Sequence, residues 1–509
     1  MRIAAFIVGR GTAPHPSPRF VASRRRSWSR RAVLLAALVP IALGLALPQL
    51  RAQGDPLAPW RLRLEAIHRA VAERAHVGIL VASLDRGDIL YAINADRLFV
   101  PASSLKLFTT AAVLDRLGPE HRFETTVLAL LRKVPGRRSG PGGEWDVTLK
   151  GGGDPVLTSQ DLAELAAATR KAGITRVDRR LRCDDTWFDA QRLGYAWDWD
   201  DEPYPYAAQI SALSVNGNAT QVRIAPAARP GLPVRVAPEP FFPGSVDCFA
   251  TTGPADIPDT LAVSRRRARN EIVVAGQMPL GAEPRTLPVT VEEPALFAGW
   301  TFRHELTRQG VRATPLPELR AAPPTARVIA RHASPPLLEI LLRFIKPSNN
   351  LIGEMLLKAL GRERCGEGST AAGLAEVEAF LREQGIDANS FCFKDGSSLS
   401  RLNLVSPRAL VQLLQAMRRH RHARMFLDSL PVAAVDGTLR RRMASTAAAS
   451  NLRGKTGTLT SVSALSGYLR CAGGEELVFS ILTNNYPGPA ADLKQMEDRL
   501  AVALAELRR

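Results

Sequence analysis

The chain changes character twice along its length, and this change limits the folds open to it. Residues 61–117, and the stretch from about residue 326 onward, carry apolar side chains at helical spacing, with strand-like runs near both chain ends. Residues 123–324 are instead rich in proline, glycine and short strand-like runs. The simplest fold is one α/β domain interrupted by an insertion, with strands from near both ends sharing one sheet.

Particular segments support this arrangement. The N-terminal part predicts a helix over 61–74, a hairpin of strands 77–85 and 88–95, and a buried helix over 102–117. The C-terminal part predicts helices and two strands, followed by a closing helix: 335–345, 349–360, 369–384 and 407–418, then strands 463–471 and 475–484, then helix 490–507. With 509 residues, 46% of them apolar, the chain is long enough for a large core and is neither mainly disordered nor a polytopic membrane protein.

The net charge of +18 is concentrated at the N-terminus. Residues 1–52 hold nine arginines and no acidic residue, and without them 58 basic residues face 49 acidic ones, a net charge of +9. The remaining excess is diffuse, which favours an anionic polymer or a peripheral contact with a membrane surface over nucleic acid.

The first 52 residues predict an export signal. A basic stretch, Arg24–Arg31, precedes a 17-residue apolar run, and Leu50-Arg51-Ala52 allows a cut after Ala52. The alternative is an uncleaved anchor, although 17 residues is short for a span. Ser29–Leu34 also has a twin-arginine pattern, so the export route stays open. Either reading predicts that the rest of the chain works outside the cytoplasm, in the periplasm.

Cysteine and histidine spacing gives no metal or redox motif. None of the five cysteines has C-x-x-C spacing, and the eight histidines show no ligand spacing such as H-E-x-x-H. An oxidising compartment would permit disulfides, but their pairing cannot be deduced from the sequence. We therefore expect neither a metal nor another cofactor.

Three short motifs carry chemistry. Ser103-Ser104-Leu105-Lys106 fits S-x-x-K, which places a lysine amine one helical turn from a serine hydroxyl. Ser348-Asn349-Asn350 fits S-x-N at the start of an apolar helix, where helix capping is the alternative role. Lys455-Thr456-Gly457, followed by Thr458, offers an ammonium and hydroxyls to a substrate carboxylate, with Gly457 leaving room for substrate backbone.

The conjunction of the motifs is more informative than any one of them. S-x-x-K, S-x-N and K-T-G, in this order, form the set found in β-lactamases and penicillin-binding proteins. Lysine is scarce, with nine residues against 58 arginines, yet two of the nine lie in these motifs.

From about residue 60 to its end, the chain resembles the D-alanyl-D-alanine carboxypeptidase/endopeptidase family, peptidase family S13, the low-molecular-mass class C penicillin-binding proteins. The 245 positions between Ser103 and Ser348 also resemble this family, because ordinary β-lactamases lack the inserted domains. Ser398 stands where the family usually has glycine in D-G-S-G-L-S. The segments that carry the resemblance are residues 101–106, 151–155, 206–216, 348–350, 395–403, 430–443 and 454–458.

The resemblance implies a β-lactamase/transpeptidase-like domain, an antiparallel sheet flanked by helices, formed by 53–122 and 325–509. One or two small β-rich domains, 123–324, would interrupt it. It also implies that the chain is a penicillin-sensitive serine hydrolase that acts on peptidoglycan stem peptides and cross-links, with β-lactams as covalent inhibitors.

The residue roles are likewise implied by the resemblance. Ser103 would be the nucleophile, Lys106 the general base and Ser348 the proton relay. The substrate-binding residues would be Asn350, Lys455, Thr456, Gly457 and Thr458. Asp395 and Arg401 are expected as scaffold near the site, and Asp184, Asp185 and Asp189 as solvated turn residues or, alternatively, as readers of a charged stem-peptide side chain.

Three other functions remain open at this point. A serine β-lactamase would use the same motifs but deacylate quickly. A non-catalytic penicillin-binding sensor would acylate without turnover, although no transmembrane relay is visible. A plain serine esterase would have no need for Lys455 and Thr456, whose chemistry suits a peptide with a free carboxylate.

Overall fold

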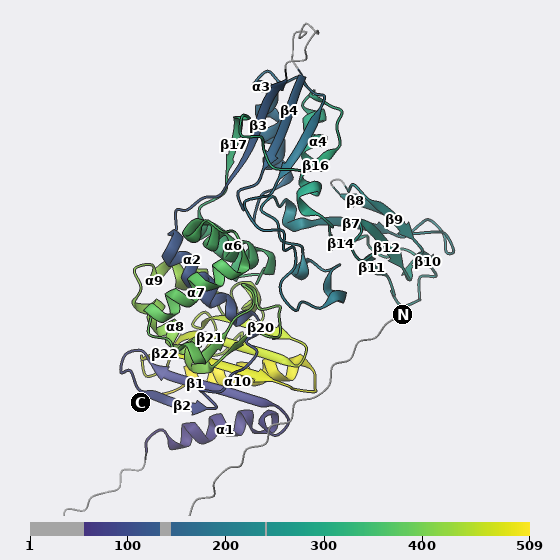
Figure 1. The fold of residues 1–509 in the computed structure, drawn as a ribbon. Coiled ribbons are helices and arrows are strands. Elements are labelled where there is room, and N and C mark those ends of the chain that lie inside the picture. The colour runs from purple at the N-terminus through teal and green to yellow at the C-terminus, as the bar shows by residue number, and fades with distance from the viewer. Residues whose placement is uncertain (1–54, 133–143, 240–241) are drawn as a thin grey trace, which may run out of the picture. The chain divides into compact units, whose positions relative to one another are not determined.

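The structure, a computed structural model, describes residues 55–132, 144–239 and 242–509. The predicted export signal, residues 1–52, lies outside this range. Strands from both ends of the described chain form one antiparallel sheet of order β2-β1-β22-β21-β20, as the sequence predicted (Figure 1). The strands are β1 (His76–Ser83), β2 (Ile89–Ile93), β20 (Arg453–Leu459), β21 (Val462–Arg470) and β22 (Glu476–Asn484).

This sheet is buried on both faces. In β1, Ile79 and Val81 belong to a core shared with the first and last helices, whereas Leu80 and Ala82 belong to the core of the helical layer on the opposite face. The alternation follows from the two-residue period of a strand. The helices of the first face are α1 (Ala58–Ala72) and α10 (Ala490–Ala505); those of the second include α2 (Lys106–Leu117) and α8 (Pro407–Arg419).

The helical layer is built around α2, which is almost completely buried. Its buried residues include the entire run Lys106–Leu114, and helices from the C-terminal half of the chain surround it. These helices are α5 (Leu337–Ile345), α6 (Asn350–Cys365), α7 (Thr370–Glu383) and α9 (Ala423–Ser429). The S-x-x-K motif therefore opens the central helix of the layer, and the S-x-N motif opens α6, which packs against it.

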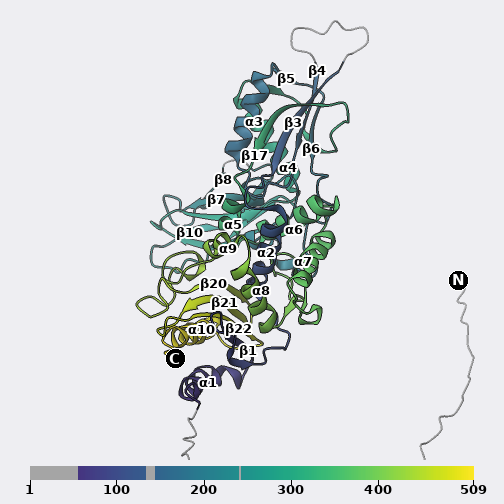
Figure 2. The ribbon, with the colours of Figure 1, turned by 90° about the vertical axis from the view of Figure 1, so that its left-hand side faces the viewer.

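The middle of the chain forms a second five-stranded sheet, of order β16-β6-β4-β3-β17, with its own core (Figure 2). Two helices, α3 (Ser159–Lys171) and α4 (Pro294–Arg308), contribute to this core. Strand β17 pairs antiparallel with β3, with Arg331 opposite Thr126, so the chain returns to α5 directly from this sheet. The strands are β3 (Glu124–Arg132), β4 (Glu144–Lys150), β6 (Arg180–Asp184), β16 (Pro317–Leu319) and β17 (Arg327–Ala333).

A separate core lies among short strands within residues 219–290. Two three-stranded sheets, of order β14-β7-β8 and β11-β12-β9, carry most of it. Their strands are β7 (Ala219–Ala225), β8 (Arg235–Glu239), β9 (Ser245–Cys248), β11 (Ala262–Arg265), β12 (Glu271–Ala275) and β14 (Arg285–Thr290). Further short strands pair as β5 (Arg176–Val177) with β15 (Arg312–Ala313), β10 (Thr251–Gly253) with β13 (Gln277–Pro279), and β18 (Phe391–Cys392) with β19 (Leu404–Val405). The expected fold class, a helix-flanked antiparallel sheet interrupted by β-rich elements, is confirmed.

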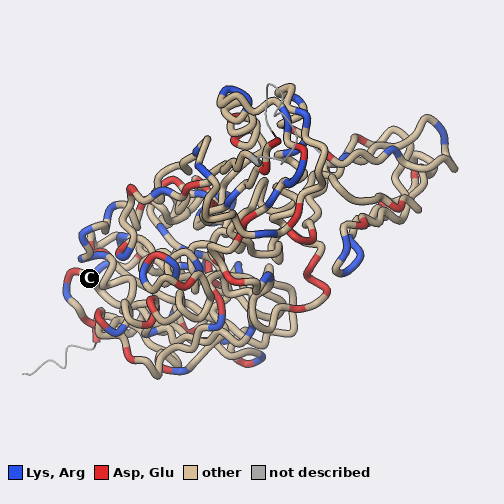
Figure 3. The backbone as a smooth tube through the Cα atoms, turned by 45° about the horizontal axis from the view of Figure 1, so that its top comes forward, with Lys and Arg blue, Asp and Glu red and all other residues tan. Residues whose placement is uncertain are grey.

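Residues of both charges are distributed along the described chain. Figure 3 shows lysine and arginine interspersed with aspartate and glutamate along the tube. All five cysteines are free thiols in the structure. Across the three described ranges, no helix combines the length and apolarity that crossing a bilayer requires.

Candidate active site

Ser103 lies in a one-turn 3₁₀ helix, Ala102–Leu105, that leads directly into α2. The preceding residue, Ala102, has a φ of 44°, in the left-handed region that non-glycine residues seldom adopt. The turn places the half-buried Ser103 hydroxyl at the start of the helix, and Lys106 Nζ donates a hydrogen bond to Ser103 Oγ at 2.8 Å. The S-x-x-K spacing thus produces the serine–lysine contact that it predicted.

Lys106 is completely buried and its amine has three acceptors. Besides Ser103, Nζ donates to Asn350 Oδ1 at 2.7 Å and to the carbonyl oxygen of Ser397 at 2.6 Å. Burial lowers the pKa of Lys106 to about 7, although the nearby carboxyl groups of Asp395 and Glu354 oppose this shift. An amine with such a pKa is partly neutral near pH 7 and can accept the serine proton.

The Ser348-Asn349-Asn350 turn divides two roles between its two amides. Asn349 caps α6, its side chain accepting a hydrogen bond from Ile352 N at 3.1 Å. Asn350 instead reaches inward: its Oδ1 accepts from Lys106, and its Nδ2 donates to the Tyr206 carbonyl oxygen at 2.8 Å. Ser348 has a φ of 64° and is half-buried. The capping alternative therefore holds for Asn349, while Ser348 and Asn350 belong to the site.

The Lys455-Thr456-Gly457 motif lies in the edge strand β20, beside the Ser103 turn. Lys455 is fully buried, and its Nζ donates to the carbonyl oxygen of Thr456 at 2.7 Å. Burial, together with the charge of Lys106, holds the pKa of Lys455 well below its ordinary value. Thr456 Oγ1 donates to Thr438 Oγ1 at 2.6 Å, which orients both hydroxyls.

Gly457 is required by the close approach of β20 to the serine turn. A Cβ at this position would lie 2.9 Å from Ser103 N and 2.8 Å from the Pro101 carbonyl oxygen. Both are backbone atoms and cannot rotate away, so a larger residue would push β20 away from Ser103. The glycine thus makes room for the backbone of the Ser103 turn.

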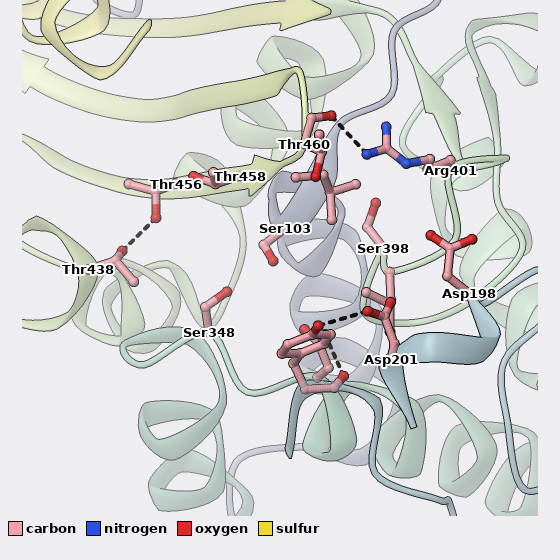
Figure 4. A pocket seen from close by; sticks show the side chains of 14 residues that line it. Ser103, Asp198, Asp201, Ser348, Ser398, Arg401, Thr438, Thr456, Thr458 and Thr460 are labelled. Atoms are coloured by element: carbon pink, nitrogen blue, oxygen red, sulfur yellow. Dashed lines mark hydrogen bonds between the residues drawn. The ribbon is translucent and has the colours of Figure 1, made fainter. Parts of the chain in front are cut away.

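These elements enclose a cavity of about 450 Å³, shown in Figure 4. Five of the residues predicted from the sequence line it, namely Ser103, Ser348, Asn350, Thr456 and Thr458. The other three, Lys106, Lys455 and Gly457, are buried and contact the lining residues or their backbone. In Figure 4, Ser103 lies between Thr456, Thr438 and Ser348 on one side and Ser398, Arg401 and Asp198 on the other.

The sequence analysis missed the charged carboxylates of this cavity. Asp198 and Asp201 line it, together with Tyr206 and Arg401. Tyr206 OH donates to Asp201 Oδ1 at 2.7 Å, and Arg401 Nη2 donates to the Thr460 carbonyl oxygen at 2.8 Å. Burial and the neighbouring carboxylates raise the pKa of Asp201. No motif marks this segment, and only its fold-back onto α6 brings it to the site.

The aspartates considered as alternative readers of a charged substrate have other partners. Asp185 pairs with Arg192 at 2.6 Å, Asp189 pairs with the buried Lys358, and Asp184 accepts from Thr186 and Ala322 backbone N–H groups. None of the three lines the cavity. Their carboxylates join segments of the scaffold, and Asp184 is buried rather than placed in a solvated turn. The charge-reading role for these aspartates stays a prediction.

Asp395 has the scaffold role that the sequence suggested. It is completely buried and accepts hydrogen bonds from Ser398 N at 2.6 Å, Ser400 N at 2.8 Å and Asn403 Nδ2 at 3.0 Å. Trp197 Nε1 also donates to it, at 3.1 Å. The 395–403 loop is thereby fixed, including Ser398, whose φ of 68° is the conformation that glycine adopts most easily.

A serine hydrogen-bonded to a buried lysine, beside a Lys-Thr-Gly edge strand of a helix-flanked antiparallel sheet, is typical of the serine enzymes of the β-lactamase and penicillin-binding class. Residues 63–507 match the D-Ala-D-Ala carboxypeptidase 3 (S13) family. The chain belongs to this family.

Individual relatives agree with this assignment. The chain is 40% identical to a D-alanyl-D-alanine carboxypeptidase of an Actinomadura species, over 97% of this chain and 94% of the relative. The structure is also similar to the crystal structure of penicillin-binding protein 4 (dacB) from Haemophilus influenzae, with a TM-score of 0.78 and 25% sequence identity. This match covers 87% of this chain and 99% of the other. A second structure of that protein, complexed with a novel β-lactam, has a TM-score of 0.73 at 24% identity and covers 87% of this chain and all of the other.

Proposed function

We propose that this chain is a penicillin-sensitive serine carboxypeptidase that removes the terminal D-alanine from peptidoglycan stem peptides ending in D-Ala-D-Ala. The observation that carries the proposal is the 2.8 Å hydrogen bond from the buried Lys106 to Ser103 at the wall of the cavity. Cleavage of cross-links by the same chemistry, as an endopeptidase, is part of the proposal, because a cross-link offers the same D-alanyl carbonyl.

The acylation step follows from the contacts of Ser103. Its Oγ attacks the carbonyl carbon of the penultimate D-alanine while the proton passes to the neutral amine of Lys106. The backbone N–H groups of Ser103 and Thr458 would stabilise the oxyanion. The close packing of Gly457 against Ser103 N supports this, since it brings β20 beside the nucleophile's backbone.

Collapse of the tetrahedral intermediate needs a proton on the leaving nitrogen. We assign its delivery to Ser348, which relays to the leaving nitrogen the proton that Lys106 took from Ser103 and which lines the cavity on the same side as Thr438 and Thr456 (Figure 4). The scissile C–N bond then breaks, and the products are an ester on Ser103 and free D-alanine. Water then attacks the ester while Lys106, neutral again, accepts its proton. The acyl–Oγ bond breaks, the proton passes to Ser103 Oγ, and the carboxylic product leaves.

Substrate orientation is assigned to the opposite walls of the cavity. Asn350 holds a substrate amide, while the terminal carboxylate binds Thr456 and Thr458. The negative charge of that carboxylate would favour the protonated form of Lys455 and so oppose the effect of burial. The Thr456–Thr438 hydrogen bond supports this assignment because it orients Thr456 beside the cavity.

The charged wall formed by Asp198, Asp201 and Arg401 suits a substrate with a charged side chain upstream of the cleaved bond. A substrate ammonium would be attracted to Asp198 and a carboxylate to Arg401. Both residues lie on the side of Ser103 away from Thr456, which fits a side chain extending away from the terminal carboxylate (Figure 4).

The proposed domain organisation places the insertion between the first and second motifs. Residues 53–122 and 325–509 would form the catalytic domain and 123–324 the inserted domains, with the return boundary moved to about residue 333 because β17 pairs with β3. We further propose export to the periplasm after cleavage of residues 1–52, because peptidoglycan lies outside the cytoplasm. Peripheral membrane contact is not needed for the chemistry.

The test is turnover of a peptide ending in D-Ala-D-Ala by the purified protein, with fluorescent penicillin labelling in parallel. We expect sustained D-alanine release and one labelled band. Ser103→Ala should abolish both signals, whereas the neighbouring Ser104→Ala should keep them, because the Ser104 hydroxyl is buried and accepts or donates no hydrogen bond.

The alternative functions give different outcomes. Labelling without D-alanine release would favour a penicillin sensor or a strict endopeptidase, and rapid loss of the penicillin label would favour a β-lactamase. Retention of either activity by Ser103→Ala would remove Ser103 from the role of nucleophile.

A further inference from the structure

A cluster of one histidine and three carboxylates lies in the second five-stranded sheet, apart from the active-site cavity. His332 comes from β17, Asp161 and Glu164 from the first turns of α3, and Asp154 from the loop between β4 and α3. Donor atoms of Asp161, Glu164 and His332 all lie within 4.8 Å of one another. None of these side chains lines the cavity around Ser103.

Asp154 is the unusual member of this cluster. It is only 1% exposed, and its Oδ2 has no hydrogen-bond partner. The other oxygen, Oδ1, accepts from Val156 N at 2.9 Å and fixes the carboxylate in place. A buried carboxylate oxygen without a partner lowers the stability of the folded state. The lack of a partner for Asp154 Oδ2 is therefore consistent with a ligand that the protein does not itself supply.

Asp154 Oδ2 lies near His332 Nε2, the same nitrogen that Asp161 Oδ1 approaches. His332 Nε2 lies 3.7 Å from Asp154 Oδ2 and 3.8 Å from Asp161 Oδ1, and both distances are too long for a hydrogen bond. Zinc bonds of about 2.0–2.2 Å to nitrogen and oxygen would set two tetrahedral ligands about 3.4 Å apart. A small closure of these side chains would therefore give the spacing of metal ligands.

The two carboxylate oxygens of Asp161 have different neighbours, so this residue can cap α3 and also contact a ligand. Its Oδ2 accepts from Thr158 N and Thr158 Oγ1, each at 2.7 Å, in the capping box of α3. This leaves Oδ1 directed towards His332. Glu164 follows one turn later on the same helix, and its exposed position gives an ion access from solvent.

We propose that Asp154, Asp161, Glu164 and His332 form a structural site for a divalent transition metal of the zinc type. One imidazole with carboxylates suits zinc, whereas calcium and magnesium prefer all-oxygen sites. The bound ion would join β17 to the β4–α3 loop and to α3. Strand β17 is the last strand of this sheet in the chain and is followed by α5. The ion would therefore stabilise the packing of β17 in the sheet.

The experiment uses the full chain after dialysis against a chelator, titrated with zinc chloride by calorimetry, with bound metal counted by elemental analysis. We expect one saturable zinc ion per chain and a rise in unfolding temperature on zinc addition. His332→Ala and Glu164→Gln should each weaken zinc binding by about tenfold or more. Glu164 is exposed, so this second variant will fold even if a change at the buried part of the cluster is damaging.

Two controls make the outcome decisive. His76→Ala removes an exposed histidine at the start of β1 and should keep full zinc binding. Calcium and magnesium should not produce the saturable heat or the shift in unfolding temperature. The proposal is overturned if the wild-type chain shows no saturable zinc binding, if His332→Ala binds as tightly as wild type, or if calcium or magnesium binds as well as zinc.

Discussion

Glu354 and Ser397 form a buried link to Lys106, the lysine to which we assign the role of base. Glu354 Oε1 accepts a hydrogen bond from Ser397 N at 2.8 Å, and the carbonyl oxygen of the same Ser397 accepts from Lys106 Nζ at 2.6 Å. Gly396 N also donates to Glu354, at 3.1 Å. Glu354 therefore acts on Lys106 through the backbone of the 395–403 loop as well as through its charge.

This link predicts a contrast between two variants of Glu354. Burial and the adjacent Asp395 raise the pKa of Glu354, so its side chain approaches the neutral form that glutamine imitates. Glu354→Gln should keep most of the penicillin acylation rate, because the amide oxygen still accepts from the loop. Glu354→Ala leaves two buried N–H groups without an acceptor, at about 1–3 kcal/mol each, and should lower both stability and acylation.

Unfolding temperature and acylation rate, measured together, separate the two effects. A loop-positioning role is contradicted if Glu354→Ala loses stability but acylates at the wild-type rate.

The lowered pKa of Lys106 predicts how the acylation rate depends on pH. Because burial lowers its pKa to about 7, the neutral, proton-accepting fraction of the amine increases as pH rises through 7. The acylation rate with penicillin should therefore rise from pH 5 to pH 8 with a midpoint near 7. Lys106→Arg should acylate far more slowly at every pH, since a guanidinium does not lose its proton in this range.

The lowered pKa of Lys106 also makes the stability of the folded chain depend on pH. Below pH 7 the folded chain holds a buried ammonium, and above it the folded state binds fewer protons than the unfolded state, whose lysine titrates near 10.5. The contribution of Lys106 to the unfolding free energy should thus increase with pH between about 7 and 10.5. A pH-independent acylation rate between pH 5 and pH 8 would contradict the assignment of Lys106 as base.

The close approach of Gly457 to the backbone of Ser103 predicts that a larger side chain at position 457 would displace the Ser103 turn or β20. Gly457→Ala would place a methyl group 2.9 Å from Ser103 N, and the required shift of β20 should cost about 1–3 kcal/mol and slow acylation more than it weakens folding. Gly473→Ala is the matched control, because its nearest contact would be 3.2 Å away at the chain terminus. Denaturant unfolding and penicillin labelling are the two measurements; equal acylation by both variants would contradict the close approach.

The local part of the active site could be predicted from the sequence because its geometry is set by short-range spacing. Ser103 and Lys106 are one turn apart on any helix, and an apolar helical pattern around them already indicated burial. The helices predicted in the N- and C-terminal parts agree with the structure to within five residues at each end, for the same reason, whereas the short α9 was not predicted. The 2.7 Å contact between Lys106 and Asn350, 244 positions apart, instead needed the packing of α2 against α6.

The charged wall of the cavity could not be predicted in this way. Asp198 and Asp201 lie in a segment without helical or strand periodicity, and their place depends on the Asn350–Tyr206 hydrogen bond and the Trp197–Asp395 contact. Strands such as β10, with three residues, are likewise too short to show a period. Only long-range packing determines these parts.

The charged wall leads to the last prediction, which concerns substrate choice. Asp198→Asn should weaken the binding of peptides whose upstream side chain ends in an ammonium, and Arg401→Gln should weaken binding where that side chain carries a carboxylate. Each loss should appear as a several-fold rise in KM, about 1 kcal/mol for a partly exposed charge pair. Peptides with an uncharged side chain at that position should be unaffected, as should labelling by a small penicillin.

Asp200→Asn is the matched control, because Asp200 is exposed, neighbours both carboxylates in sequence and does not line the cavity. Raised salt should reduce the difference between charged and uncharged peptides in the wild-type protein, since the interaction is electrostatic and partly exposed. If Asp198→Asn and Asp200→Asn change KM equally for the ammonium-bearing peptide, a general surface charge explains the preference. If only Asp198→Asn changes it, the wall opposite Thr456 selects the substrate side chain.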